Sequence, residues 1–209
     1  MEKLTRWFNI SGGVSRVDFE SADTPYGEAI RLAIATESFR SGAASPVFKQ
    51  EETALVSDRG LESFHIIESA EGYRSETRGD RRDEGLVVSV SSDGVQGNLT
   101  FSPDSFDLST YELLMLDRKD LKQLAQESFR LFDPDDLDIY IARLRSEGRV
   151  VRVDGRAMKV HEVVINVEGA EFRMNLTADG DVLTIGSSEF NAIMVTEAQM
   201  QERKKALVA

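Results

Sequence analysis

The chain contains no cysteine, and this absence excludes several kinds of chemistry. Without thiols there are no disulfides, no thiolate nucleophile and no zinc or iron–sulfur site built on cysteine. Histidine is also scarce, because the 209 residues include only two, His65 and His161. The glycine-rich Rossmann fingerprint and the Walker lysine motif are both missing, so nucleotide binding is not expected. The sequence therefore predicts no metal site and no cofactor.

Long apolar runs are missing as well. No stretch approaches the roughly 20 apolar residues that span a bilayer as a helix, so we expect no integral membrane segment. Residues 1–12 lack the apolar stretch of a signal peptide, which on its own favours a cytoplasmic protein. If a signal peptide was removed and replaced by Met1, the same chain would be periplasmic or would reside in the bacterial envelope.

Positive charge is in the minority, with 25 basic against 37 acidic residues and a net charge of -12. The resulting field repels phosphate backbones, so nucleic-acid binding would need a local basic patch. The best candidate is the group Arg78, Arg81 and Arg82, which acidic residues interrupt and which resembles a solvated hairpin. We therefore expect no nucleic-acid partner.

The composition is that of a folded globular protein. Hydrophobic residues make up 41% of the chain and charged residues 30%, which is too apolar for a disordered chain. The length fits one β-rich domain over residues 1–209, with a polar tail from about residue 197 that reads as a solvated helix end.

Alternation of apolar and polar residues recurs along the chain and is typical of antiparallel strands with one buried face. Asp-Gly and Glu-Gly pairs, which favour type I′ hairpin turns, separate the segments near the C-terminus. We expect Val163, Ile165 and Val167 to share one sheet face with Phe172, Met174 and Leu176. The expected strands lie around 17–19 and 30–34, and at 61–69, 73–82, 86–91, 97–101, 149–153, 158–167, 171–177 and 182–185.

Between the two β-rich regions the spacing becomes helical. Leu121, Leu124, Ala125 and Phe129 predict a short helix with Asp120 as its N-cap. For residues 135–146, acids and a proline resemble a helix start, ahead of apolar residues at helical spacing. The same residues allow a strand through 137, 139 and 141. We favour the helix.

The sequence offers few candidates for catalysis or metal binding. His65 or His161 could act as a general base with a nearby carboxylate, but the Gly-x-Ser-x-Gly elbow of hydrolases is missing. The acidic residues between Asp133 and Asp138 suggest calcium, yet the loop template requires glycine at Asp138 and glutamate at Leu144. Helix capping explains this acidic segment without a metal, and no catalytic residue is assigned.

Phenylalanines are spread over the expected strands and helices alike, which indicates a packed core or an apolar cavity beneath a curved sheet. The run Leu113-Leu114-Met115-Leu116 could cap such a cavity. The fold class expected is mainly β (α+β): a large curved antiparallel sheet or half-barrel of strand meanders, with one or two short helices.

The order of several short motifs resembles uncharacterised bacterial envelope proteins that are similar in fold to LolA-like lipoprotein carriers. The motifs are Trp7 to Gly13, Asp58 to Leu61, Asp107 to Tyr111 and the closing Asp-Gly hairpins. The resemblance implies a curved sheet wrapped around a helix, in which some members hold lipid or other apolar groups. It carries no functional residue over to this chain.

Three functional hypotheses follow. The first is a non-enzymatic β-rich binding module that holds an apolar or lipid-like ligand, in the bacterial envelope if the chain is exported. The second is a structural module with a filled core that docks another protein and takes no small ligand. The third is a hydrolase that uses His65 or His161 with a carboxylate.

Overall fold

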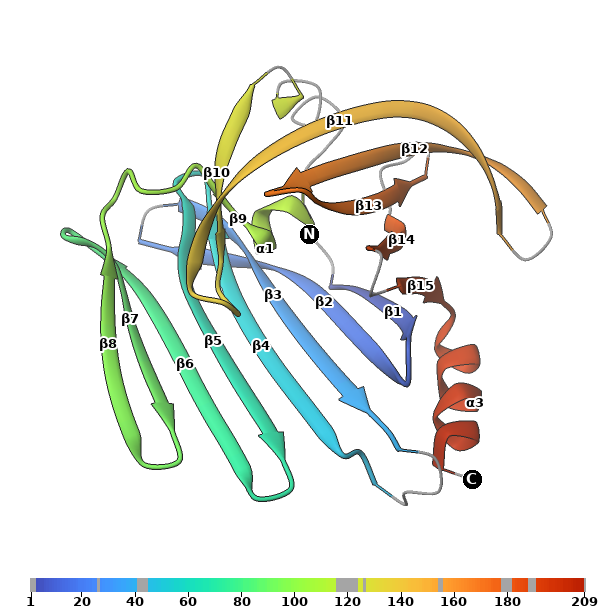
Figure 1. Cartoon of the computed structure of the whole chain (residues 1–209), viewed down its shortest axis with the longest axis horizontal. Coiled ribbons are helices and arrows are strands. Elements are labelled where there is room, and N and C mark those ends of the chain that lie inside the picture. The colour runs from blue at the N-terminus through green and yellow to red at the C-terminus, as the bar shows by residue number, and fades with distance from the viewer. Residues whose placement is uncertain are drawn as a thin grey trace.

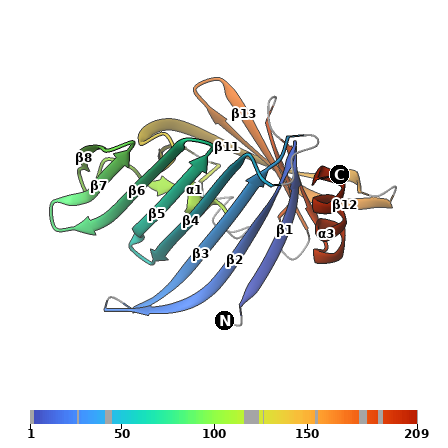
Figure 2. The same cartoon turned by 90° about the horizontal axis from the view of Figure 1, so that it is seen from below.

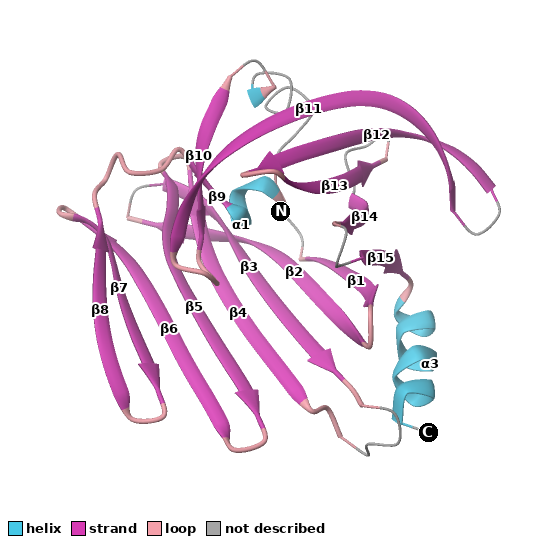
Figure 3. Cartoon of the chain, in the orientation of Figure 1, coloured by secondary structure: helices cyan, strands magenta, loops and turns pink. Residues whose placement is uncertain are grey.

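The computed structural model describes residues 3–25, 27–40, 45–115, 124–125, 127–153, 156–177, 182–187 and 191–208. Strands dominate these residues, as the magenta arrows in Figure 3 show. All of the described strands belong to one 15-stranded sheet with the order β8-β7-β6-β5-β4-β3-β2-β1-β15-β14-β13-β12-β11-β10-β9. Apart from the parallel pair β9 and β10, neighbouring strands are antiparallel.

The N-terminal half is a continuous meander in which each strand pairs with the next (Figure 1). Glycines occupy several of its tight turns, for example Gly60, Gly72 and Gly94 at positive φ, where L side chains are strained. The strands are β1 (Leu4–Ile10), β2 (Gly13–Thr24), β3 (Gly27–Ser38), β4 (Phe48–Ser57), β5 (Gly60–Ala70), β6 (Tyr73–Arg82), β7 (Gly85–Ser92) and β8 (Val95–Phe101).

The C-terminal half begins at the far end of the sheet and returns to the start of the chain, where β15 pairs with β1. Its elements are β9 (Leu108–Ser109), α1 (Thr110–Leu113), β10 (Ser128–Asp133), β11 (Asp138–Val153), β12 (Arg156–Val167), β13 (Ala170–Leu176), β14 (Val182–Gly186), β15 (Asn191–Val195) and α3 (Glu197–Val208).

The sheet curls without closing, so that its β9 end lies against β5 and α1 lies between the two halves (Figure 2). The core fills this concave interior. Phe132 of β10 is fully buried, and its ring centroid lies 4.9 Å from those of Phe101 and Phe106 and 6.0 Å from that of Phe64. These rings join β10 to β5 and β8, which are distant in the strand order.

The predicted fold class is confirmed, and so is the register of the C-terminal hairpin. Val163 pairs with Met174 and Ile165 with Phe172 around a turn in which Glu168 and Gly169 have φ values of 50° and 96°. Phe172 is nevertheless 40% exposed, so sharing the core face did not bury it. The predicted turns at Asp154-Gly155 and Asp179-Gly180 lie outside the described residues.

The predicted helix over 135–146 is wrong. This segment contains the β10–β11 turn, and β11 runs from Asp138 onward in antiparallel pairing with β10. Asp133 accepts a hydrogen bond from the Asp135 backbone N–H at 3.0 Å, so it closes a turn where we expected a helix cap. Phe129, expected on the preceding helix, is buried in strand β10, whereas residues 120–123 lie outside the described residues.

The polar tail forms α3, as predicted, and this helix packs beside β1 and β2. Met200 is 1% exposed and anchors it, while Lys204 pairs with Glu37 and the Arg203 side chain donates to Asn9 Oδ1 at 3.2 Å. None of the helices within the described ranges is long and apolar enough to cross a membrane.

Candidate apolar cavity

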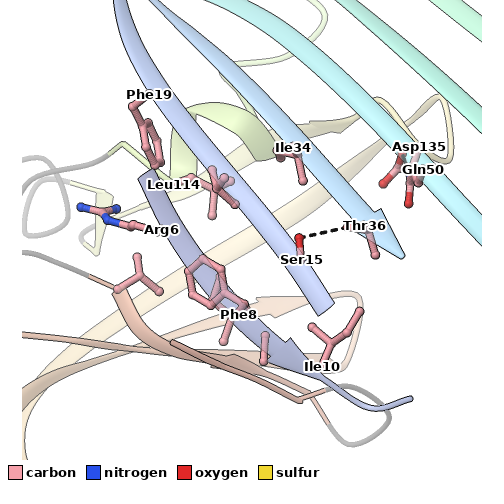
Figure 4. Close-up of a pocket in the computed structure, with 14 residues that line it drawn as sticks. Arg6, Phe8, Ile10, Ser15, Phe19, Ile34, Thr36, Gln50, Leu114 and Asp135 are labelled. Carbon is pink, nitrogen blue, oxygen red and sulfur yellow. Dashed lines mark hydrogen bonds between the residues drawn. The ribbon is translucent and has the colours of Figure 1, made fainter. Parts of the chain in front are cut away.

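A cavity of about 320 Å³ lies on the concave side of the sheet, between β1–β3 and the strands β14 and β15 (Figure 4). Most of its wall is apolar. The apolar lining residues are Phe8, Ile10, Val17, Phe19, Ile34, Leu114, Val182, Ile185 and Ala192.

Strand periodicity explains why these side chains meet. Phe8 and Ile10 are two residues apart on β1, and Val17 and Phe19 are two apart on β2, so each pair points to the same face. Ile10 pairs with Ala192, so β15 lies beside β1, on the side away from β2. Leu114, the C-cap of α1, also lines the cavity, and it belongs to the run starting at Leu113 that we expected to cap such a cavity.

Five polar residues also line the cavity, which are Arg6, Ser15, Thr36, Gln50 and Asp135. The hydroxyls of Ser15 and Thr36 lie 3.0 Å apart and hydrogen-bond to each other. Gln50 Nε2 donates to Asp135 Oδ1 at 2.9 Å. The Arg6 guanidinium lies 5.0 Å from the centre of the Phe19 ring. Figure 4 shows Arg6 and the Gln50–Asp135 pair on opposite sides of the apolar centre.

Beyond Asp135, the interior holds further acidic groups. Tyr111 Oη donates to Glu52 Oε2 at 2.8 Å, and both residues are buried. Burial raises the pKa of Glu52, and the charges of Asp133 and Glu68 raise it further, although the Tyr111 hydrogen bond opposes the change. Burial likewise raises the pKa of Asp133. These carboxyls therefore favour the protonated state more than ordinary surface acids do.

Asp135 carries the clearest shift in this group. Solvent reaches its side chain, yet protein surrounds it on most sides within the concave interior. Burial, followed by the charges of Glu52 and Asp133, raises the pKa of Asp135 to about 8. Asp135 therefore favours the protonated state more than an ordinary aspartate does, and Arg6 contributes a guanidinium to the same cavity wall. Within the described part of the chain, no three histidine, aspartate or glutamate side chains are placed to hold a metal ion.

The two histidines lie on different strands, His65 on β5 and His161 on β12. His65 Nε2 lies 3.0 Å from Glu76 Oε1, and Arg78 also binds that carboxylate oxygen at 2.6 Å. A surface depression of about 250 Å³ beside His65 includes Ser63. No hydrogen bond between the described residues joins His65 to Ser63, so a histidine–carboxylate pair is present without a serine positioned by it.

Sequence reasoning missed the polar residues of the interior. Glu52 and Tyr111 are 59 residues apart in the chain and no local motif links them. Two inward-facing polar residues on β4, Gln50 and Glu52, were the available signal, because they interrupt the apolar face that a buried strand should show.

The chain matches no protein-family model and no curated protein. Its fold is similar to the crystal structure of a beta-barrel-like protein of the domain of unknown function DUF1849 from Brucella abortus. The TM-score is 0.54 and the sequence identity is 13%, over 93% of this chain and 95% of that chain. At this identity the similarity shows the fold alone, which is a β-rich, barrel-like architecture.

Proposed function

We propose that this protein is a non-enzymatic binding module that holds an apolar or lipid-like ligand in the cavity between β1–β3 and β14–β15. The observation that carries the proposal is the apolar wall around a cavity of about 320 Å³. Small-molecule sites typically span about 300 to 1,000 Å³ and combine an apolar lining with a few polar groups that fix orientation.

The polar residues of the cavity are compatible with a ligand that is mainly apolar. The pKa of Asp135 is raised, so an apolar group entering beside it meets less charge than it would beside an ordinary aspartate. The Ser15 and Thr36 hydroxyls hydrogen-bond to each other, and the apolar surface of β1 and β2 supplies the main contact. Burial of that surface supplies the binding energy.

The carrier-like part of the proposal rests on the motif order noted in the sequence and on the curved sheet around α1. A half-barrel that opens on one side suits reversible uptake of a lipid-like group, as a carrier in the bacterial envelope would need. The protein of similar fold from Brucella abortus is described as beta-barrel-like and of unknown function, so it supports the architecture alone.

Filling the cavity tests the proposal. Ile34 is half-buried and points into the cavity, whereas its neighbour Ala35 is exposed on the opposite face of β3. We expect Ile34→Trp to weaken binding of a fluorescent polyene fatty acid at least about tenfold, or 1.4 kcal/mol. Ala35→Trp is the matched control and should bind like wild type. Equal binding by both variants, or no saturable binding by wild type, would contradict the proposal.

The hydrolase alternative rests on the His65–Glu76 pair and has its own test. We expect wild type to hydrolyse p-nitrophenyl esters of short and long acyl chains no faster than His65→Ala does. A turnover that disappears in His65→Ala, while the cavity variant Ile34→Trp retains it, would establish catalysis at the outer face.

A further inference from the structure

Strand β8 forms one end of the sheet, and no described strand pairs with its outer edge. Residues 95–100 are all exposed, with Val95 at 73% and Leu99 at 47%. An edge of this kind presents a row of backbone N–H and C=O groups that are available for pairing with another strand.

The usual protection of an edge strand is missing from β8. It has seven residues, with neither a charged side chain nor a proline, although 30% of the whole chain is charged. Natural sheets commonly shorten their edges or place lysine, proline or a bulge there. The other end of this sheet follows that rule, because β9 has two residues and leads directly into α1.

The two faces of β8 differ in polarity. Val95, Leu99 and Phe101 pair with β7 residues on the concave side, where Leu86 and Val88 are buried. Gln96, Asn98 and Thr100 alternate with them and face the convex side. The strand therefore offers an apolar stripe, a neutral polar stripe and an open edge together.

We propose that β8 pairs in antiparallel fashion with β8 of a second copy of this chain, about a twofold axis at Asn98. In this register Val95 lies opposite Phe101 of the partner subunit, and Gln96 lies opposite Thr100 of the partner subunit. Apolar residues then lie opposite apolar residues, and neutral polar residues lie opposite neutral polar residues. No like charges face each other along the paired segment.

A second copy fits this edge better than an unrelated peptide, because the pattern is self-complementary about its centre and a twofold interface requires that property. The net charge of -12 on each copy opposes association at long range. Salt screens this repulsion, so dimerisation should strengthen as ionic strength rises.

The absence of native cysteine permits a direct test on the full-length chain. Asn98→Cys places two thiols on the proposed axis, where facing Cα atoms of antiparallel strands lie about 4.5 to 5.5 Å apart, within disulfide range. Ser89→Cys is the matched control, since Ser89 is exposed and pairs with Asn98 from the next strand inward. Mild oxidation followed by a non-reducing gel measures the cross-linked fraction.

We expect Asn98→Cys to cross-link at least about tenfold faster than Ser89→Cys, and wild type to show a salt-strengthened monomer–dimer equilibrium by sedimentation. Equal cross-linking rates would overturn the proposal, because they indicate random collisions. A wild-type protein that stays monomeric at high micromolar concentration and high salt would also overturn it. So would a dimer in which Asn98→Cys does not cross-link, since that places the interface elsewhere.

Discussion

Truncation of Phe132 to alanine measures how strongly the two halves of the sheet are joined. Phe132 is completely buried and contacts three other phenylalanine rings that come from β5, β8 and the segment before β9. Phenylalanine-to-alanine changes in a core cost about 3 to 5 kcal/mol, and each well-packed aromatic pair adds about 0.5 to 1.5 kcal/mol beyond burial. We expect a loss near the upper end, about 4 to 5 kcal/mol, because three ring pairs are lost together.

The matched control is Phe172→Ala, which removes the same side chain from a site that is 40% exposed on β13. We expect it to cost less than about 2 kcal/mol, since partial exposure leaves less surface to return to water. Urea unfolding followed by far-UV circular dichroism, and by fluorescence of the single tryptophan, Trp7, gives both values. Similar losses for the two variants would refute the reasoning that β10 is inserted into the core.

Two further substitutions test the raised pKa of Asp135 and the close packing of the sheet. The pKa of Asp135 is about 8 in the folded chain, whereas that of an ordinary aspartate is 3.8, so Asp135 makes the wild type less stable as the pH rises between these values. Asp135→Asn should be as stable as wild type near pH 4 and about 1 to 2 kcal/mol more stable than wild type near pH 8, a figure discounted for solvent screening. Urea unfolding midpoints of the two proteins measure this difference. Midpoints that do not diverge across this pH range would show that the pKa of Asp135 is ordinary. Gly79→Ala would place its Cβ 2.1 Å from the Phe64 ring and should cost about 1 to 3 kcal/mol. Gly97→Ala, whose Cβ meets nothing within 4 Å, should be tolerated, and thermal unfolding compares the two variants. Equal melting temperatures for these two glycine variants would show that Phe64 does not cover Gly79.

Much of the sheet could be predicted from local pattern. β6 was predicted with its observed bounds, 73–82, because turns enclose a strand whose alternation is regular. The C-terminal hairpin was equally accessible, since Glu168-Gly169 fixes the register and one face is apolar. In these segments, local sequence and tertiary packing favour the same structure.

The segment after Asp133 shows why the rest was not accessible. An aspartate followed by proline and further acids can begin a helix or close a turn, because both use the same side-chain hydrogen bond to a nearby backbone N–H. The contacts of Phe132 with aromatic rings from distant strands favour a strand at β10. Because these contacts join residues far apart in the chain, local sequence does not reveal them. The cavity was missed in detail for a similar reason, since its wall combines β1, β2, α1 and β14.

The most direct test of ligand binding in the cavity uses a fatty alcohol that carries a photoreactive diazirine on its alkyl chain. After irradiation, mass spectrometry identifies the labelled residues. We expect saturable labelling on β1, β2 and β15, which contribute Phe8, Val17 and Ala192 to the wall, and its loss in Ile34→Trp. Labelling that is confined to the exposed edge β8, or that does not saturate, would contradict ligand binding in the cavity.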